Sequence, residues 1–361
     1  MNTPENPVRF AYVGCGFVGQ KIHIPNFAAL PDCDFIALAE PRSDLGERVA
    51  KRYGIRKLYK SHEEIAADPE IEAVGVSAPF TLQGAIAQDL LRAGKHVFME
   101  KPMAVSMKRA DALVETERNS QGRLMVGYMK RYDTGNILLK KHADAWRAAG
   151  GQIVFARAHG FGGNWVYATD PNIPFESSKT PPPPAPVDEF PEWLPEQWCK
   201  PYLEYLQQWT HNANLLRFFL GDGGGKTQVK SVQLDASGLT GIVVLEINGA
   251  RAVIESAYTG FHGWDEHTQL YFKDGWLRTS APALMQKEMP ATVEVYRAPT
   301  EGRPAQLTQE FSQPAWAYRE EAKHFLECVR SGAPFNSTAE DTRHDVRLFE
   351  EIYREFITTQ K

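Results

Sequence analysis

Glycines cluster near the start of the chain, where residues 14–19 read Gly-Cys-Gly-Phe-Val-Gly and fit the pattern G-x-G-x-x-G. They follow a short apolar run and precede a segment that can form a helix. In such a turn the first glycine permits a tight bend, the second lets the backbone approach a pyrophosphate, and the third permits close helix packing. The helix N-terminus adds free N–H groups and the positive end of its dipole. The alternative is a glycine-rich turn without a ligand. We predict that a dinucleotide binds at Gly14, Gly16, Phe17, Val18 and Gly19.

An acidic residue stands at the distance that such a site requires. Glu40 lies 21 residues after Gly19, at the end of a second apolar run. A carboxylate there accepts hydrogen bonds from a ribose 2′-hydroxyl and repels a 2′-phosphate. Arg42, two residues on, would instead suit a 2′-phosphate, unless it is a solvated loop charge or stacks on adenine. We therefore expect NAD rather than NADP, with Glu40 and Arg42 both near the adenosine.

Two further segments carry side chains that can handle a proton. Residues 93–102 read Ala-Gly-Lys-His-Val-Phe-Met-Glu-Lys-Pro, and residues 209–217 read Trp-Thr-His-Asn-Ala-Asn-Leu-Leu-Arg. Lys101 would be a poor base at its ordinary pKa of about 10.4, but burial lowers that value, and an ammonium stabilises a developing alkoxide. His211 has an ordinary pKa near 6.5, which suits acid–base catalysis. The alternatives are a surface lysine before a proline turn and a structural histidine.

These residues must be positioned by strands and helices that alternate along the first part of the chain. Short apolar runs occur at residues 9–13, 34–39, 73–77, 96–99 and 124–127, with helical stretches such as 45–53 and 84–93 between them. Near-continuous apolar strands are typical of a parallel sheet that is buried on both faces. The pattern predicts a doubly wound α/β domain over residues 1–128. Lys101 then follows the fourth strand, at the carboxyl edge where ligands bind.

Residues 129–361 predict a second domain of a different kind. Asn-Gly at 248–249 and Asp-Gly at 274–275 separate apolar runs and indicate hairpins, so we expect an open, mostly antiparallel sheet with helices. Ten prolines lie between Pro171 and Pro201, and residues 181–184 are consecutive prolines that favour polyproline II. This excursion, residues 170–201, could be a disordered linker. Its tryptophans and phenylalanines favour an ordered segment packed over the second domain.

Together these segments resemble the glucose–fructose oxidoreductase and inositol dehydrogenase (Gfo/Idh/MocA) superfamily over essentially the whole chain. The resemblance implies a Rossmann domain, an α+β substrate domain, and NAD(P)-dependent redox chemistry on a secondary alcohol of a sugar, glycoside or cyclitol. It implies that Lys101 lies at the nicotinamide and the substrate hydroxyl, and that the Lys101–Pro102 peptide is cis. It also implies a homodimer or homotetramer formed through the C-terminal sheet.

The family usually has Asp-x-x-x-His on a helix of the second domain, whereas this chain has Gln207 four residues before His211. Residues i and i+4 share a helix face, but Gln207 can only donate or accept hydrogen bonds. His211 must then carry the acid–base work itself. His159, which precedes Asn164 and Trp165, is a weaker candidate. The resemblance implies further cofactor contacts by Ser77, Ala78, Pro79, Gln83, Glu100, Lys101 and Arg131, and substrate contacts by Lys101, Tyr128, Arg131, Asn164, Trp165, Gln207 and His211.

Two other functions compete with a dehydrogenase. NAD-dependent glycosidases of similar fold oxidise C3, eliminate and re-reduce, and the proline-rich excursion suits a substrate as large as a glycoside. A non-catalytic dinucleotide-binding regulator is the third possibility, against which Lys101 and His211 argue.

Composition excludes several other classes of partner and location. The 361 residues carry 40 Lys and Arg against 45 Asp and Glu, a net charge of −5 with no basic block, which argues against nucleic acid. No apolar run approaches the roughly 18 residues of a membrane helix, and residues 1–7 lack the character of a signal peptide. The four cysteines do not have metal-site or disulfide-scaffold spacing. We therefore expect a cytoplasmic protein with reduced thiols and no bound metal.

Overall fold

The computed structural model describes residues 6–182, 184, 189–260 and 264–359. The chain divides into two units. The first combines Met1–Tyr128, Asp170–Pro191 and Tyr318–Val346, and the second combines Met129–Thr169, Glu192–Ala317 and Arg347–Lys361. Residues 183 and 185–188 of the excursion, Pro183 of the predicted polyproline run among them, lie outside the described residues.

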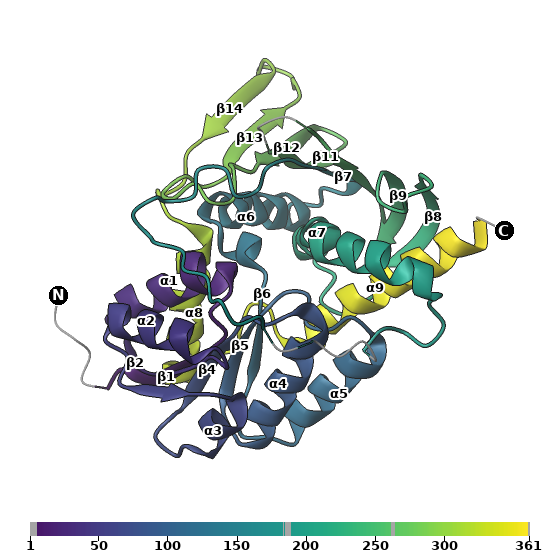
Figure 1. The fold of residues 1–361 in the computed structure, drawn as a ribbon. Coiled ribbons are helices and arrows are strands. Elements are labelled where there is room, and N and C mark those ends of the chain that lie inside the picture. Colours follow the sequence, from purple (N-terminus) through teal and green to yellow (C-terminus); the bar gives the residue numbers. More distant parts are fainter. Residues whose placement is uncertain (1–5, 183, 185–188, 261–263, 360–361) are drawn as a thin grey trace. The chain divides into compact units, whose positions relative to one another are not determined.

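The first unit contains a six-stranded parallel sheet in the order β3-β2-β1-β4-β5-β6 (Figure 1). Its strands are β1 (Val8–Val13), β2 (Cys33–Ala39), β3 (Lys57–Tyr59), β4 (Ala73–Val76), β5 (His96–Glu100) and β6 (Leu124–Gly127). Its helices are the π-helix η1 (Gly19–His23), α1 (Ile24–Ala29), α2 (Ser43–Tyr53), α3 (His62–Ala67), α4 (Phe80–Arg92), α5 (Met107–Arg118) and α8 (Ala317–Ser331), followed by the start of α9 (Ala339–Thr359). The predicted doubly wound sheet is confirmed.

Alternate residues of the parallel strands face two different cores. On one face, Phe10 of β1 and Phe98 of β5 pack with Phe27 of α1 and Phe325 of α8, with the rings of Phe10 and Phe27 stacked at 4.2 Å. On the other face, the strands pack against α3, α4 and α5, and this core includes the fully buried residues Ile65, Val74, Leu90, Leu113 and Val126. Strands buried on both faces need apolar residues at every position, which explains the continuous apolar runs.

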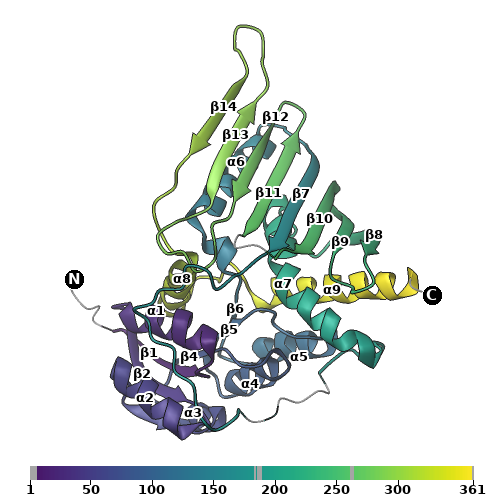
Figure 2. The same cartoon turned by 45° about the horizontal axis from the view of Figure 1, so that its top comes forward.

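The second unit is built on an eight-stranded sheet in the order β14-β13-β12-β11-β7-β10-β9-β8 (Figure 2). Its strands are β7 (Ile153–Gly162), β8 (Gln228–Leu234), β9 (Gly241–Ile247), β10 (Ala250–Tyr258), β11 (Asp265–Phe272), β12 (Gly275–Ser280), β13 (Thr292–Arg297) and β14 (Gln306–Glu310). Only β7 and β10 pair in parallel, so the expected mostly antiparallel sheet is confirmed.

Helices of the second unit pack on one face of this sheet. They are the 3-10 turn η2 (Met129–Tyr132), α6 (Thr134–Ala148) and α7 (Glu196–Leu220); α6 contacts β12 and β13, and α7 contacts β7 and β10. Helix α7 contains Pro201, which lies close enough to its N-terminus to remove only one helical hydrogen bond. Gly221 ends it in the left-handed conformation, with φ +73°. Among the described residues, no helix is long and apolar enough to cross a membrane.

The proline-rich excursion does not lie where we expected it. The described residues between 170 and 191 group with the first unit and not with the second, and residues 196–201 form the beginning of α7. The physical reason is a set of polar side chains on η1 and α2 that hold the backbone and carboxylate of the excursion, as described below. A division of the chain at residue 128 therefore omits two segments of the first unit, 170–191 and 318–346.

Candidate active site

The glycine turn between β1 and η1 has the geometry that a phosphate requires. A Cβ on Gly14, whose φ is +98°, would lie 2.2 Å from the carbonyl oxygen of Ser77, and a Cβ on Gly19 would lie 2.6 Å from the carbonyl oxygen of Gly14. Both positions therefore need glycine for packing. Gly16 differs, because nothing lies within 4 Å of the position of its Cβ. The second glycine thus leaves an open space beside the backbone, as a pyrophosphate cradle would.

Glu40 is fixed immediately beside this turn. Its side chain is almost fully buried and accepts a hydrogen bond from the backbone nitrogen of Cys15 at 2.8 Å. Arg42 Nε and Nη2 lie 2.6 and 3.0 Å from the two carboxylate oxygens, and the backbone nitrogen of Arg42 donates a further bond. The hydrogen bonds to Glu40 raise the pKa of Arg42 above its ordinary value. Arg42 therefore pairs with Glu40. The sequence analysis considered a 2′-phosphate, solvent or adenine as the partner of Arg42 and did not indicate this ion pair.

The loop after β4 closes the other side of the turn. Ser77, Ala78 and Pro79 follow β4 directly, and the backbone nitrogen of Ser77 bonds to the carbonyl of Val13 at 3.1 Å. The hydroxyl of Ser77 is buried and lies beside the hydroxyl of Tyr12, a residue of β1.

Lys101 follows β5, and the backbone on both sides of it is held by buried side chains. The Lys101–Pro102 peptide is cis. Gln83 of α4 donates from Nε2 to the carbonyls of Glu100 (2.9 Å) and Pro102 (2.7 Å). The amide nitrogen of Gln83 thus holds the loop, while its buried amide oxygen has no hydrogen-bond partner among the described residues. The predicted contact of Gln83 with the cofactor stays a prediction. Lys101 itself is half-buried, with Nζ 5.9 Å from the ring centre of Phe80.

Glu100 is anchored from the opposite side. One carboxylate oxygen lies 2.6 Å from Nε2 of His23, which is fully buried, and the other accepts a bond from the backbone nitrogen of Lys101 at 3.1 Å. Glu100 therefore holds the loop that carries Lys101, and its contact with the cofactor stays a prediction. His23 was not predicted, since one histidine in a helical segment gives no signal by itself.

Residues 170–178, called the anchored segment below, belong to the first unit and lie beside the helices that follow the glycine turn (Figures 1 and 2). Lys21 donates from Nζ to the carbonyls of Asp170 and Ile173. Gln20 exchanges two hydrogen bonds of 2.9 Å with the backbone of Glu176 and also bonds to the carbonyl of Cys15 at 2.7 Å. The helix that follows the glycine turn therefore holds the anchored segment by its backbone.

Charged and aromatic side chains reinforce this attachment. The carboxylate of Glu176 forms ion pairs with Arg48 and Arg52 of α2. The ring of Phe175 lies 5.6 Å from that of Phe17, a residue of the glycine turn. The anchored segment thus borders the predicted cofactor site, and sequence reasoning did not find it there.

In the second unit, α7 carries the predicted histidine. Trp209 donates from its indole nitrogen to the carbonyl of Gly160 on β7 at 2.7 Å, which fixes the rotation of the helix. A Cβ on Gly160 would lie 2.8 Å from the side chain of Asn212, so the helix and strand need glycine there. On this helix His211 is 7% exposed and Gln207 is half-buried.

Asn212, the residue after His211, belongs to a buried polar network that sequence analysis did not predict. Lys130 of η2 and Glu266 of β11 form an ion pair that is almost completely buried. Asn212 and Trp264 donate to the same carboxylate at 3.2 and 2.7 Å. These residues are far apart in the sequence and follow no pattern, although Lys130 stands only two residues beyond Tyr128.

The remaining predicted contacts are placed as follows. Arg131 is 5% exposed, donates from Nε to Asn214 at 2.6 Å, and lies over the ring of Phe218. Tyr128 is 1% exposed and belongs to the core of the first unit. Contacts of these two residues with a ligand stay predictions.

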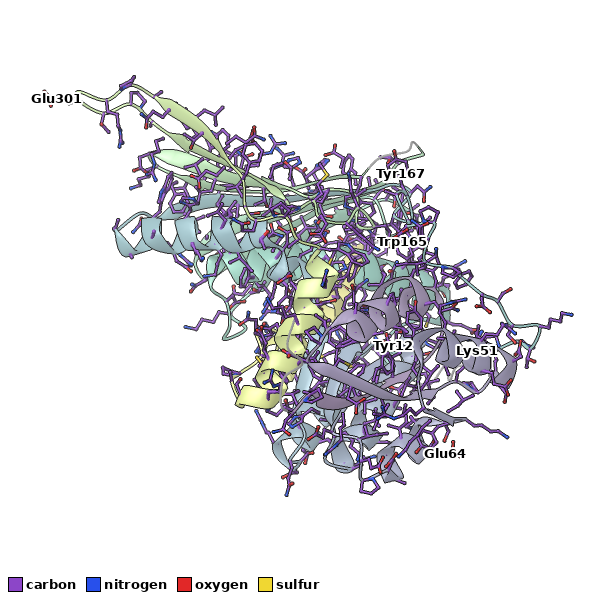
Figure 3. The ribbon with its side chains drawn as sticks, turned by 90° about the vertical axis from the view of Figure 1, so that its left-hand side faces the viewer. Tyr12, Lys51, Glu64, Trp165, Tyr167 and Glu301 are labelled. Carbon is purple, nitrogen blue, oxygen red and sulfur yellow. The ribbon has the colours of Figure 1, made fainter. Side chains whose placement is uncertain are left out.

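Asn164 and Trp165 lie on an exposed loop that follows β7 (Figure 3). Trp165 is 37% exposed, and its neighbour Tyr167 is 53% exposed. Such side chains can stack on a sugar face. His159 lies before this loop on β7, next to Gly160, which packs on α7, so His159 points to the opposite face of the sheet. It does not share a face with α7.

Comparison with known proteins gives a consistent result. Residues 8–128 match the model of the oxidoreductase family with an NAD-binding Rossmann fold, GFO_IDH_MocA. Myo-inositol 2-dehydrogenase of Thermotoga maritima is 24% identical, with 92% of each chain covered, and inositol 2-dehydrogenase of Rhizobium meliloti is 22% identical, again with 92% of each covered. Among solved structures, the 3-ketoreductase KijD10 of Actinomadura kijaniata, in a complex with NADP, has a TM-score of 0.71 at 19% identity, covering 97% of this chain and 98% of that one.

The first unit contains the glycine turn with its open second position, the carboxylate beside it and the residues that match the family. The similarity to the two inositol dehydrogenases continues through the second unit. The predicted resemblance is therefore confirmed: residues 8–128 belong to the Gfo/Idh/MocA family of NAD-binding oxidoreductases, and the chain resembles members of that superfamily over nearly its whole length.

Proposed function

We propose that this protein is an NAD-dependent dehydrogenase that transfers a hydride between the nicotinamide and a secondary alcohol of a sugar, glycoside or cyclitol. The observation that carries the proposal is the support of Lys101. Gln83 and Glu100 hold the backbone on both sides of this lysine at the carboxyl edge of β5. In the sheet, β5 is separated from β1 and its glycine turn only by β4. Inositol dehydrogenases among the relatives support the substrate class.

The residues present fit a dinucleotide. The open space at Gly16 and the helix that follows suit the pyrophosphate, Glu40 suits a ribose, and Ser77 lies where the loop after β4 meets the turn. When bound, the nicotinamide supplies the acceptor or donor of hydride.

The chain itself must handle the proton of the substrate hydroxyl. We assign this to Lys101 and His211, since an ammonium stabilises a developing alkoxide and an imidazole can accept or donate a proton near neutral pH. Gln207 cannot take a proton, so its contribution is an orienting hydrogen bond. Asn164 and Trp165 of the exposed loop would contact the sugar.

The pairing of Glu40 with Arg42 supports NAD over NADP. A 2′-phosphate could bind Arg42 only by drawing it away from Glu40, which would leave a buried carboxylate unpaired beside the phosphate. We expect tighter binding of NADH than of NADPH, and a smaller difference in Glu40→Ser, where Arg42 is released. Fluorescence titration of both cofactors with both proteins measures this. Equal affinities in the wild type would contradict the role of Glu40.

A second candidate function is favoured by the anchored segment. This segment is held by Gln20, Lys21 and α2 beside the proposed cofactor site, where it would hinder release of the cofactor. An enzyme that oxidises and then re-reduces its substrate needs to keep the same cofactor between these steps. Such a cycle cleaves a glycoside without net formation of NADH.

One assay separates the two functions. The protein is incubated with NAD or NADP and a panel of inositols, monosaccharides and nitrophenyl glycosides, while NADH absorbance and released nitrophenol are both recorded. NADH that accumulates with an inositol or a sugar supports the dehydrogenase. Nitrophenol without NADH supports the glycoside-cleaving enzyme, and neither signal with any substrate would count against both.

A further inference from the structure

A group of titratable side chains lies on the face of the second unit's sheet that is opposite α7. His159 of β7 is paired in register with Glu255 of β10 on one side and with His267 of β11 on the other. Asp265, two residues before His267, lies on the same face because side chains alternate along a strand. β11, β7 and β10 are neighbouring strands in the middle of the sheet (Figure 2). This cluster is separate from the face on which α7 packs.

The three side chains lie close enough together to share an ion; the rings of His159 and His267 are stacked at 4.7 Å with 20° between their planes, so one ring must rotate for both to face it. Each of His159, Asp265 and His267 offers a ligand atom, and these atoms all lie within 4.8 Å of one another. Nε2 of His159 is 3.4 Å from one carboxylate oxygen of Asp265, and Nδ1 of His267 is 3.8 Å from the other. The second distance is too long for a hydrogen bond, and Nδ1 of His267 is buried without a hydrogen-bond partner among the described residues.

We propose that His159, His267 and Asp265 bind a divalent transition-metal ion. Bonds of about 2.0–2.2 Å to nitrogen and oxygen in a tetrahedral centre place neighbouring ligand atoms about 3.3 Å apart. The observed separations of 3.4 and 3.8 Å, each measured to a different carboxylate oxygen of Asp265, are close to that spacing. An ion would also satisfy the buried nitrogen of His267. Three protein ligands leave at least one position for water.

Glu255 fixes the orientation of His159, one of the proposed ligands. It lies 2.6 Å from Nδ1 of His159, so the ring is held with Nε2 directed toward Asp265. Metal-binding histidines usually donate their second nitrogen to a carboxylate, which fixes both the tautomer and the orientation of the ring. Arg157 in turn bonds to Glu255 at 2.7 Å and holds that carboxylate in place.

The ligand types decide which ions the site would take. Two imidazoles and one carboxylate suit Zn²⁺, Co²⁺, Ni²⁺ and similar ions, whereas Mg²⁺ and Ca²⁺ prefer oxygen ligands alone. Each nearby guanidinium has a carboxylate partner: Arg157 is paired with Glu255, and Arg278 lies 3.9 Å from Glu294. Sequence analysis predicted no metal because the ligands come from two strands and have no motif spacing.

The test is a titration of the full chain, after treatment with a chelator and dialysis, with ZnCl₂ by isothermal calorimetry. We expect one ion per chain and no comparable heat with MgCl₂. Titration with CoCl₂ gives a second readout, because nitrogen ligation produces a visible absorption band. His159→Ala and His267→Ala should each weaken Zn²⁺ binding at least tenfold, and Glu255→Gln by about 10- to 100-fold.

Two further variants test whether a loss of Zn²⁺ binding is specific to the cluster rather than a result of misfolding. Asp265→Asn changes a side chain that is 59% exposed, so it should fold normally and still weaken Zn²⁺ binding. His142→Ala removes a histidine of α6 that pairs with Glu310 in the same unit and should leave binding unchanged. The proposal is overturned if the wild type binds no Zn²⁺ at micromolar concentration, or if His159→Ala and Asp265→Asn bind it as the wild type does. None of these readouts depends on dehydrogenase activity.

Discussion

At the scale of single residues, the backbone around Lys101 is held in place by the side chains of other residues. The amide of Gln83 holds the carbonyl groups on both sides of Lys101, and Glu100 holds its backbone nitrogen while being held by His23. A lysine side chain is long and flexible, so its reach is set by where its backbone is fixed. The loop therefore restricts the volume that the ammonium group can occupy, which a proton-handling residue requires.

The order in which substitutions reduce turnover tests the proposed chemistry. Lys101→Ala and His211→Ala should each lower kcat by at least about 10²-fold, as expected for the loss of one acid–base group, with cofactor binding retained. Gln207→Ala should cost less, because only an orienting hydrogen bond is lost. Gln207→Asp should be tolerated, since a carboxylate can support the protonated form of His211. Steady-state kinetics over a range of pH, with fluorescence titration of NADH, measures these effects.

One ordering would contradict the assignment of His211. If Gln207→Ala were as damaging as Lys101→Ala while His211→Ala were harmless, the proton would have to pass elsewhere. The buried pair of Lys130 and Glu266, which Asn212 joins to α7, would then be the place to look. His159 would not, because it lies on the opposite face of the sheet.

Glu321 of α8 makes a prediction about stability and pH. Its side chain is fully buried, neither oxygen has a hydrogen-bond partner among the described residues, and Glu100 and His23 lie close by. Burial, with a smaller effect of Glu100, raises the pKa of Glu321 well above its ordinary value. The folded state therefore favours the protonated acid, and the carboxyl group destabilises it increasingly as the pH rises above the unfolded-state pKa of about 4.3.

Glu321→Gln should remove this cost, because glutamine keeps the shape and cannot ionise. We expect the variant to melt at a higher temperature than the wild type at pH 8, and the difference to shrink as the pH falls toward 4. Calorimetric melting of both proteins across this range measures the effect. Glu320→Gln, a change at the neighbouring residue, whose side chain is 32% exposed, is the control and should show no such trend. A difference in Tm that grows toward acid pH would contradict the raised pKa.

At the scale of elements, buried strands could be predicted and edge elements could not. The runs at 9–13 and 73–77 correspond to β1 and β4 within one residue at each end, because strands covered on both faces must be apolar throughout. β3 was missed: it has three residues, lies at the sheet edge and is partly exposed, so its apolar content is low. α7 begins at Glu196, well before the segment 209–217 that the sequence analysis singled out, since Pro201 is tolerated near a helix start.

Contacts made by the backbone explain most of what sequence analysis missed in the site. Lys21 and Gln20 hold carbonyl groups and an amide of the anchored segment, and any residue provides such groups. Gln83 likewise bonds to carbonyls rather than to side chains. A motif reports the types of side chains that a site needs, so it finds Gly14 or Lys101 but not the residues that hold their neighbours.

The anchored segment should slow the release of the cofactor. Glu176→Ala removes the ion pairs with Arg48 and Arg52 while leaving the backbone bonds of Gln20 possible. We expect the dissociation rate of NADH to rise severalfold, with a smaller change in the association rate, as is usual when contacts around a bound ligand are lost. Stopped-flow fluorescence measures both rates. Arg56→Ala is the control, because it breaks an exposed pair with Asp34 elsewhere in the same unit. Unchanged dissociation in Glu176→Ala would show that the segment does not retain the cofactor.

At the scale of the whole molecule, the uncovered face of the eight-stranded sheet predicts association. Helices α6 and α7 cover one face, and there the residues of β7 and β10 are mostly buried. On the opposite face Phe155, Val253 and Tyr271 are only half-buried, and Ile242 is 44% exposed. Apolar side chains that are only half-buried beside the charged cluster around His159, in the middle of a sheet, are typical of a protein–protein interface.

We expect a homodimer, or a tetramer built from it, in which this face meets its copy across a two-fold axis. A symmetric interface places the same patch on both chains, so one substitution acts twice. Phe155→Glu should therefore dissociate the assembly, because it puts two charges into a contact of about 800 Å² per chain. Val154→Glu is the matched control: the next residue on β7 points to the other face and is 47% exposed, so it should leave the assembly intact. Light scattering of the three proteins at micromolar concentration gives their masses. A monomeric wild type, or a Phe155→Glu variant with the mass of the wild-type oligomer, would show that this face is not the interface.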